Sequence, residues 1–156
     1  MSVYMRQMQG IVRDYIDSGQ PWPATARTIA RWAISARRWQ PQPATIIDQC
    51  ADQLSRAMAE EYIPDPQGRM VRAKHAARLE VQGRQETLWA DIRTAPRGHM
   101  ETAFRQRRGQ IVGECRQLKR DVDSYNQNAS LDNPIPLILD FTYDVAEEEA
   151  LEGRSA

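Results

Sequence analysis

The segment that decides the fold is residues 43–93, which read PATIIDQCADQLSRAMAEEY, IPDPQGRMVRAKHAARLE and VQGRQETLWADIR in succession. In the first part, apolar residues recur at steps of three and four, which predicts an amphipathic helix over residues 44–62. The run Pro66-Gln67-Gly68 then favours a tight turn, because glycine adopts a positive φ at little cost. The segment therefore predicts a helix followed by a reversal of the chain.

The rest of this segment, Arg69–Arg93, has two interpretations. Its alanines favour a helix, whereas the turn signal Gln82-Gly83 and the alternating run ETLWADIR favour a β-hairpin. We predict a long hairpin with basic strands, because the turn signal and the alternation point to the same structure.

Two further helices are predicted upstream. Residues 3–17 and 26–36 each carry apolar residues at steps of three and four, and Thr25 is the expected N-cap of the second helix. The prolines of QPQP at 40–43 then interrupt the helical pattern, because proline has no amide hydrogen to donate. Helix, turn, helix and basic hairpin thus follow one another over residues 1–93.

A long helix is predicted after the hairpin, from Thr94 as its cap to about Asn126. Near its end the apolar residues are spaced four, three, four and three apart, which is the heptad spacing of a coiled coil. This interaction seam consists of Ile111, Cys115, Leu118, Val122 and Tyr125. The seam either packs on the chain's own body or joins two chains, and the spacing leaves both readings open. Residues 127–156 are predicted to form a polar linker, a short strand over 134–145 and an acidic tail.

The net charge of zero conceals two parts of opposite charge. Residues 1–126 hold 20 Lys and Arg against 14 Asp and Glu, a net charge of +6, whereas residues 127–156 hold one against seven, a net charge of −6. Arginine supplies nearly all the positive charge and suits contacts with phosphate and carboxylate groups. A second basic cluster, Arg105, Arg107 and Arg108, lies on the predicted long helix.

The composition is that of a globular protein, with 41% hydrophobic and 27% charged residues. No apolar run reaches the roughly 18–20 residues that a membrane span needs. The N-terminus also lacks the apolar centre of a signal peptide, so we expect a cytoplasmic protein.

The first 93 residues resemble the winged helix-turn-helix superfamily. Thr25–Ala36, the QPQP break and Thr45–Tyr62 resemble the second helix, the turn and the third helix of that superfamily. Val3–Asp17 then corresponds to the first helix, and Arg69–Arg93 to an extended wing. The resemblance implies binding of duplex DNA through the third helix and the wing. The cations that it implies as nucleic-acid contacts are Arg37, Arg38, Arg56, Arg69, Arg72, Lys74 and Arg78.

Taken together, the sequence predicts a mostly helical α+β protein in three parts. They are a three-helix, winged-helix-like module with a long β-hairpin over 1–93, a long amphipathic helix over 94–126, and a linker, short strand and acidic tail over 127–156. No phosphate-binding glycine loop, nucleophile motif or zinc-ligand spacing is present, so we expect no catalytic residues, no metal and no cofactor.

Two functions are compatible with this pattern. The first is a nucleic-acid-binding accessory or regulatory protein. The second is a protein–protein adaptor or homodimer that uses the interaction seam. They differ in their salt dependence, because contacts with phosphate weaken steeply as salt rises and an apolar seam responds little.

Overall fold

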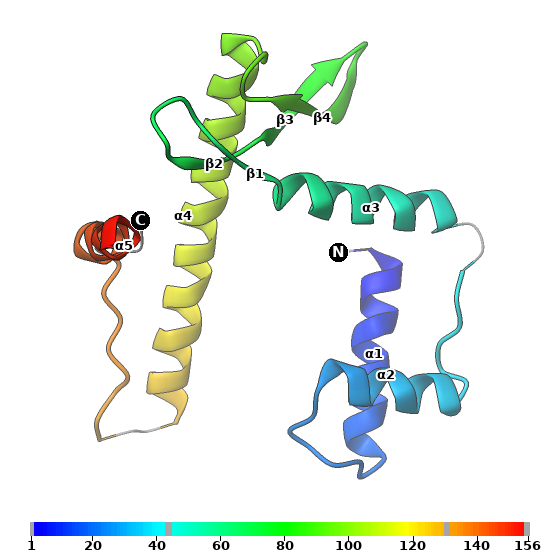
Figure 1. Cartoon of the computed structure of the whole chain (residues 1–156). Helices are drawn as coiled ribbons and strands as arrows, with labels where there is room; N and C mark the ends of the chain where they lie inside the picture. The colour runs from blue at the N-terminus through cyan, green and yellow to red at the C-terminus, as the bar shows by residue number, and fades with distance from the viewer. Residues whose placement is uncertain (1, 43–44, 130–131, 155–156) are drawn as a thin grey trace. The chain divides into compact units, whose positions relative to one another are not determined.

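The computed structural model describes residues 2–42, 45–129 and 132–154 (Figure 1). Within these residues it is an α+β structure with five α-helices and two separate two-stranded antiparallel sheets, which confirms the predicted class. The chain divides into two compact units, residues 1–55 and 56–156. The predicted division was at 93/94 instead, and the contacts of the second hairpin explain the difference, as described below.

The first unit contains α1 (Val3–Asp17), α2 (Ala26–Ser35) and the first part of α3 (Ile46–Ala59). Thr25 caps α2 as predicted, since its hydroxyl accepts the amide hydrogen of Thr28 at 3.0 Å. The small core is centred on Tyr15, which is 1% exposed and meets the Trp32 ring edge-on at a centroid distance of 5.5 Å. The Tyr15 hydroxyl donates a 2.7 Å hydrogen bond to the Pro21 carbonyl, so its one polar atom is satisfied.

The predicted helix over 44–62 is confirmed in its central part but ends earlier, at Ala59. Tyr62 instead begins β1 (Tyr62–Pro64). A physical reason is Pro64, because a proline disfavours helical geometry in the residue before it. None of the residues of α3 is buried.

The first hairpin was not predicted. β1 pairs with β2 (Met70–Arg72) in the register Ile63↔Val71, and the turn between them contains Gly68 at a φ of 85°. Asp65 fastens this turn, because one carboxylate oxygen accepts the amide hydrogens of Gln67 and Arg69 at 3.0 and 2.8 Å. The single wing expected over Arg69–Arg93 is therefore wrong in its extent, since β2 belongs to a separate hairpin.

The second hairpin confirms the turn predicted at Gln82-Gly83. β3 (Lys74–Val81) pairs with β4 (Arg84–Asp91), and the two turn residues have φ values of 50° and 77°. Two positive φ values are the signature of the tight turn whose twist matches paired strands. The inward face of β3 carries His75 and Ala77, which are 8% and 0% exposed.

The long helix α4 (Arg97–Asn128) begins three residues after the expected cap, because Thr94 lies in a turn whose amide bonds to the Asp91 carbonyl. Its N-terminal part packs against β3 (Figure 1). Ala103, the one buried residue of α4, lies in this part. The second hairpin therefore belongs to the same unit as α4, which places the boundary before the hairpin rather than after it.

The short strand predicted over 134–145 is wrong. Residues 132–141 form no strand, and α5 (Thr142–Arg154) occupies the region expected to be an acidic tail without regular structure. Two prolines, Pro134 and Pro136, remove backbone donors that a strand needs for pairing. Alanine, glutamate and leucine in the following run favour a helix.

Candidate nucleic-acid interface

The largest concentration of predicted site residues lines a groove of about 710 Å³ between β3 and α4. We call it the basic groove. From the strands it takes Arg72, Lys74, His75, Ala76, Arg78, Thr87 and Trp89, and from the helices Ala59, Ala103, Gln106, Arg107, Gly109 and Gln110. Its four cationic side chains come from three elements, β2, β3 and α4, and α4 is distant from the strands in sequence.

Gln106 of α4 ties the helix to β3 at the groove. In the register of the second hairpin, the Arg78 backbone points away from β4, toward α4. The Gln106 carboxamide bonds to both backbone groups of Arg78. The carboxamide oxygen accepts from the Arg78 amide at 2.7 Å, and the carboxamide nitrogen donates to the Arg78 carbonyl at 2.8 Å. One side chain thus replaces a neighbouring strand at this point and fixes the spacing of β3 and α4.

Two histidines lie between the hairpin and the helix, of which His75 is buried and His99 is half-buried. The His75 ring packs edge-on against Phe104 with centroids 5.4 Å apart, and its Nε2 lies 2.8 Å from the Arg72 carbonyl oxygen. The Nε2 atom of His99 lies 2.9 Å from the His75 carbonyl oxygen. These bonds position the backbone of Arg72 and β3 rather than presenting an imidazole to solvent.

Lys74 is neutralised by two carboxylates. Its ammonium lies 2.9 Å from Glu61 and 3.5 Å from Asp91, and the hydrogen bond to Glu61 is the main cause that raises the pKa of Lys74. Asp91 also accepts bonds from the Arg93 guanidinium, the shortest at 2.6 Å, and these hold the pKa of Asp91 well below its usual range. Lys74 therefore contributes little unbalanced positive charge to the groove.

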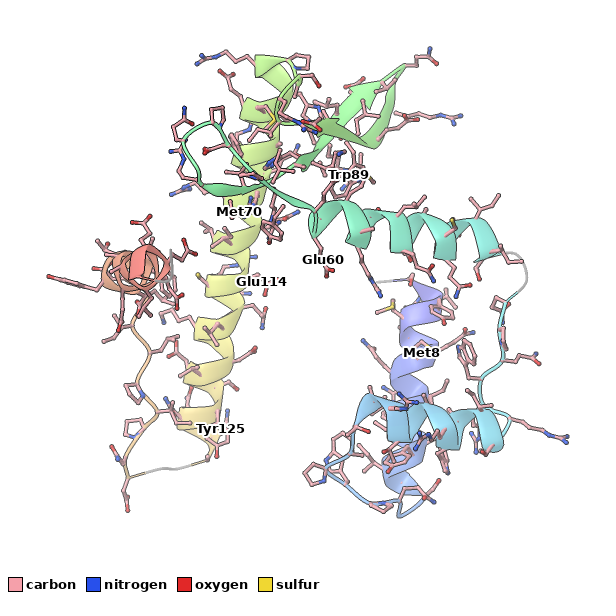
Figure 2. All side chains as sticks on the ribbon, in the orientation of Figure 1. Met8, Glu60, Met70, Trp89, Glu114 and Tyr125 are labelled. Carbon is pink, nitrogen blue, oxygen red and sulfur yellow. The ribbon has the colours of Figure 1, made fainter. Side chains whose placement is uncertain are left out.

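Arg72, Arg78 and Arg107 differ from Lys74, because no described carboxylate forms an ion pair with any of them. Trp89, which is labelled in Figure 2, lies on the second hairpin. The strand register places it opposite Ala76 and on the same face as Arg78. Its indole is half-buried. Free guanidinium groups beside an aromatic ring are suited to a ligand that carries both phosphate and planar bases.

The other predicted nucleic-acid contacts lie elsewhere. Arg37 and Arg38 belong to the first unit, and Arg38 is paired with Asp14 at 2.7 Å. Arg69 is paired with Asp65 at 2.7 Å inside the first hairpin turn. Arg56 is exposed near the end of α3. Of the seven cations predicted, the structure thus gathers Arg72, Lys74 and Arg78 in one groove.

Sequence reasoning missed three contributors to the groove. Arg107 was noted only as part of a separate cluster on the long helix, and nothing in the pattern joined it to the strand. Gln106 and Trp89 gave no signal, because a lone glutamine and a lone tryptophan are common on helix and strand surfaces. Their importance follows from the packing of β3 on α4.

The predicted interaction seam lies on α4 beyond the part that packs on β3. Ile111, Leu118 and Tyr125 are 54%, 46% and 55% exposed, and Cys115 and Val122 are half-buried. Three of the five seam residues are thus largely exposed and two are partly covered, so self-packing and dimerisation both stay predictions.

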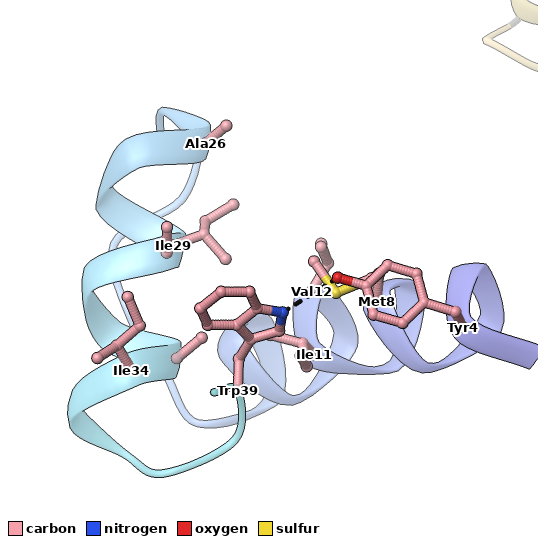
Figure 3. Close-up of a pocket in the computed structure, with 10 residues that line it drawn as sticks. Tyr4, Met8, Ile11, Val12, Ala26, Ile29, Ile34 and Trp39 are labelled. Atoms are coloured by element: carbon pink, nitrogen blue, oxygen red, sulfur yellow. Dashed lines mark hydrogen bonds between the residues drawn. The ribbon is translucent and has the colours of Figure 1, made fainter. Parts of the chain in front are cut away.

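The first unit holds a second, apolar cavity of about 390 Å³ between α1 and α2 (Figure 3). Its wall includes Met8, Ile29 and Trp39, and the Trp39 indole donates a 3.2 Å hydrogen bond to the Tyr4 hydroxyl. No described charged side chain lines this cavity, so it does not extend the basic groove.

Comparison with protein-family models, with curated proteins and with solved structures finds no match to this chain. The resemblance to winged helix-turn-helix proteins therefore stays a prediction. None of the described helices has both the length and the apolar character needed to cross a membrane. In residues 2–42, 45–129 and 132–154, no three His, Cys, Asp or Glu side chains converge as a metal site would require.

Proposed function

We propose that the protein binds nucleic acid through the basic groove and acts as an accessory or regulatory factor. The observation that carries the proposal is the convergence of Arg72, Arg78 and Arg107, from a strand region and a helix, without a carboxylate partner among the described residues. Duplex DNA is the expected ligand, and single-stranded DNA is the comparison that tests the role of Trp89.

The chemistry of the groove suits the repeating phosphates of a nucleic-acid backbone better than a single small anion. Arginine binds phosphate oxygens through two parallel donors, and three arginines spread along a groove match a repeating backbone. The indole of Trp89 adds a planar surface on which an unpaired base can stack. Lys74 is a weaker candidate, because Glu61 and Asp91 already occupy its ammonium group.

The test is the affinity for labelled duplex and single-stranded DNA at about 50 and 200 mM salt. We expect binding that weakens steeply between these salt concentrations. The triple variant R72Q/R78Q/R107Q should bind more weakly at low salt, and its dependence of log affinity on log salt should be flatter by about one for each arginine that contacts phosphate.

The matched control is R97Q, compared with R107Q alone. Both residues are arginines on α4, but Arg97 lies outside the groove and is paired with Glu101 at 2.6 Å. R107Q should reduce affinity and R97Q should leave it nearly unchanged. Equal losses would mean that binding follows net charge alone, and no binding at the lower salt would overturn the proposal.

A second candidate function is supported by the exposed seam on α4. Exposed apolar stripes of this kind mark interaction surfaces for other proteins. As an adaptor or homodimer through this seam, the protein would associate with little dependence on salt. The two candidate functions involve different parts of α4, so each can be tested without the other.

A further inference from the structure

The C-terminal half of α4 carries an apolar stripe that stays largely exposed, although the segment before α5 meets the helix at Asn126, which exchanges two 2.9 Å hydrogen bonds with the Ile135 backbone. β3 packs on the N-terminal half of the helix. There Phe104 contacts His75, Gln106 bonds to the Arg78 backbone, and Ala103 is buried. Beyond it, Ile111, Leu118 and Tyr125 remain about half exposed. Most of the stability of a helix in a protein comes from packing an apolar face, so a partner that covered this stripe would stabilise this half of α4.

The charges beside the stripe indicate what covers it. With Ile111 and Leu118 at heptad position d and Cys115 and Val122 at a, Glu114 falls at position g and Lys119 at position e. In a parallel pair of helices, a g residue faces the e residue five positions later in the other helix. Glu114 of each copy would then face Lys119 of the other copy.

The antiparallel arrangement brings different charges together. There, g positions face g positions, which places Glu114 beside Asp121 of the second copy. This contact joins like charges, whereas the parallel contact joins opposite ones. Charges at e and g set the orientation of coiled coils in this way, so the sequence of α4 favours the parallel pair.

We propose that the protein forms a parallel homodimer through the α4 seam, with Glu114 of each copy paired to Lys119 of the other. In the single chain, the Lys119 ammonium is paired with Asp123 of the same helix at 2.6 Å. In the dimer, Lys119 would pair with Glu114 of the other copy instead. Figure 2 shows Glu114 and Tyr125 along the same helix, with Tyr125 near its C-terminal end. This inference deepens the second candidate function by naming the partner, and it does not depend on nucleic-acid binding.

The length of the seam sets the strength of the dimer. Ile111–Tyr125 covers about two heptads, fewer than the three or four of a long coiled coil. Arg108 occupies the preceding a position and ends the apolar stripe where the hairpin begins to cover the helix. The dimer is therefore reversible, and its population rises with protein concentration.

Sedimentation of the full chain over a range of concentrations tests the dimer. We expect the wild type to shift from monomer to dimer, and L118E to remain monomeric at concentrations where the wild type is dimeric. The control is S124E, which adds the same charge at an exposed position of α4 outside the seam. Circular dichroism verifies that each variant is folded. A wild-type monomer at every concentration, or a dimer unaffected by L118E, overturns the proposal.

Orientation is tested by charge exchange and by Cys115. E114K and K119E should each weaken the dimer several-fold, and the double variant E114K/K119E should restore it. With Cys50 replaced by serine, oxidised glutathione should convert two Cys115 thiols into one disulfide while becoming two molecules of reduced glutathione. A dimer that fails to cross-link through Cys115 and is not restored by charge exchange contradicts the parallel arrangement.

The dimer and the basic groove can fail separately. A monomer that binds DNA overturns the dimer alone, and a dimer that does not bind DNA overturns only the groove.

Discussion

At the scale of single residues, Asp91 at the end of β4 is the most strongly tied carboxylate of the second unit. It accepts the backbone amide of Arg93 at 2.9 Å and two side-chain bonds from the same arginine, while Lys74 approaches at 3.5 Å. These contacts favour the charged form, so the pKa of Asp91 lies well below its usual range. Asp91 thus links the two strands of the hairpin to the turn that leads into α4.

This arrangement predicts a pH-dependent contribution to stability. A depressed pKa in the folded chain stabilises the fold above the pKa of an unfolded aspartate, about 3.9, and this contribution is lost progressively as the pH falls from there toward the folded pKa. D91N should therefore lower the free energy of unfolding at neutral pH, and its difference from wild type should shrink in acid.

Urea unfolding at about pH 7 and pH 3 measures this difference. The control is D52N, which replaces an exposed aspartate of α3 that forms no ion pair with a described residue. A D91N deficit of the same size at both pH values would show that the stabilisation does not come from the charge.

At the scale of elements, the contact of β3 with α4 creates the groove. It combines a buried face, in which His75 packs edge-on against Phe104 and Ala77 and Ala103 are buried, with the paired hydrogen bonds of Gln106 to the Arg78 backbone. Two of these residues, Ala77 and Ala103, are alanines and bury little apolar area. The bonds from Gln106 therefore represent a large share of the specific contacts between the two elements.

Replacing Gln106 should separate strand from helix. Q106A removes two hydrogen bonds and should destabilise the second unit by about 1–2 kcal/mol. Q110A is the matched control: Gln110 lies about one turn later on the same helix and is exposed, and its replacement should change stability by less than about 0.5 kcal/mol. Hydrogen exchange of the Arg78 amide reports the contact directly. Unchanged protection of this amide in Q106A would contradict the role assigned to Gln106.

At the scale of the whole molecule, the outstanding property is the separation of charge along the chain. The basic residues concentrate before residue 127, whereas α5 carries Asp144 and the run Glu147, Glu148 and Glu149. If the groove binds nucleic acid as proposed, an acidic helix attached to the basic residues 1–126 would repel that ligand and compete with it for the same cations. The net charge of zero is thus the sum of two parts with opposite preferences for a polyanion.

Deleting residues 142–156 should therefore raise the affinity for duplex DNA at low salt. The effect should diminish at about 200 mM salt, because screening weakens repulsion between separated charges. The variant E147Q/E148Q/E149Q retains the length of α5 and should reproduce much of the gain. An affinity unchanged by either alteration at low salt would show that α5 does not influence binding.

Several local features were predictable because they depend on neighbours in sequence. Thr25 as an N-cap and Gln82-Gly83 as a hairpin turn follow from side-chain geometry and backbone preference alone. The errors occur where pairing decides the structure. β2 joined a strand from the end of the predicted helix, and residues 134–145 lacked any strand with which to pair.

The sequence by itself determined the α+β class, the approximate positions of the first four helices, the turn of the second hairpin and the spacing of the α4 seam, because each depends on periodicity or turn chemistry within a few residues. Only the tertiary structure decided that β3 packs on α4, and with it the groove that joins Arg72 and Arg78 to Arg107. The tertiary structure also distinguished arginines with carboxylate partners from those without. The physical reason is that packing and ion pairing depend on distances in space, which the order of residues along the chain does not specify.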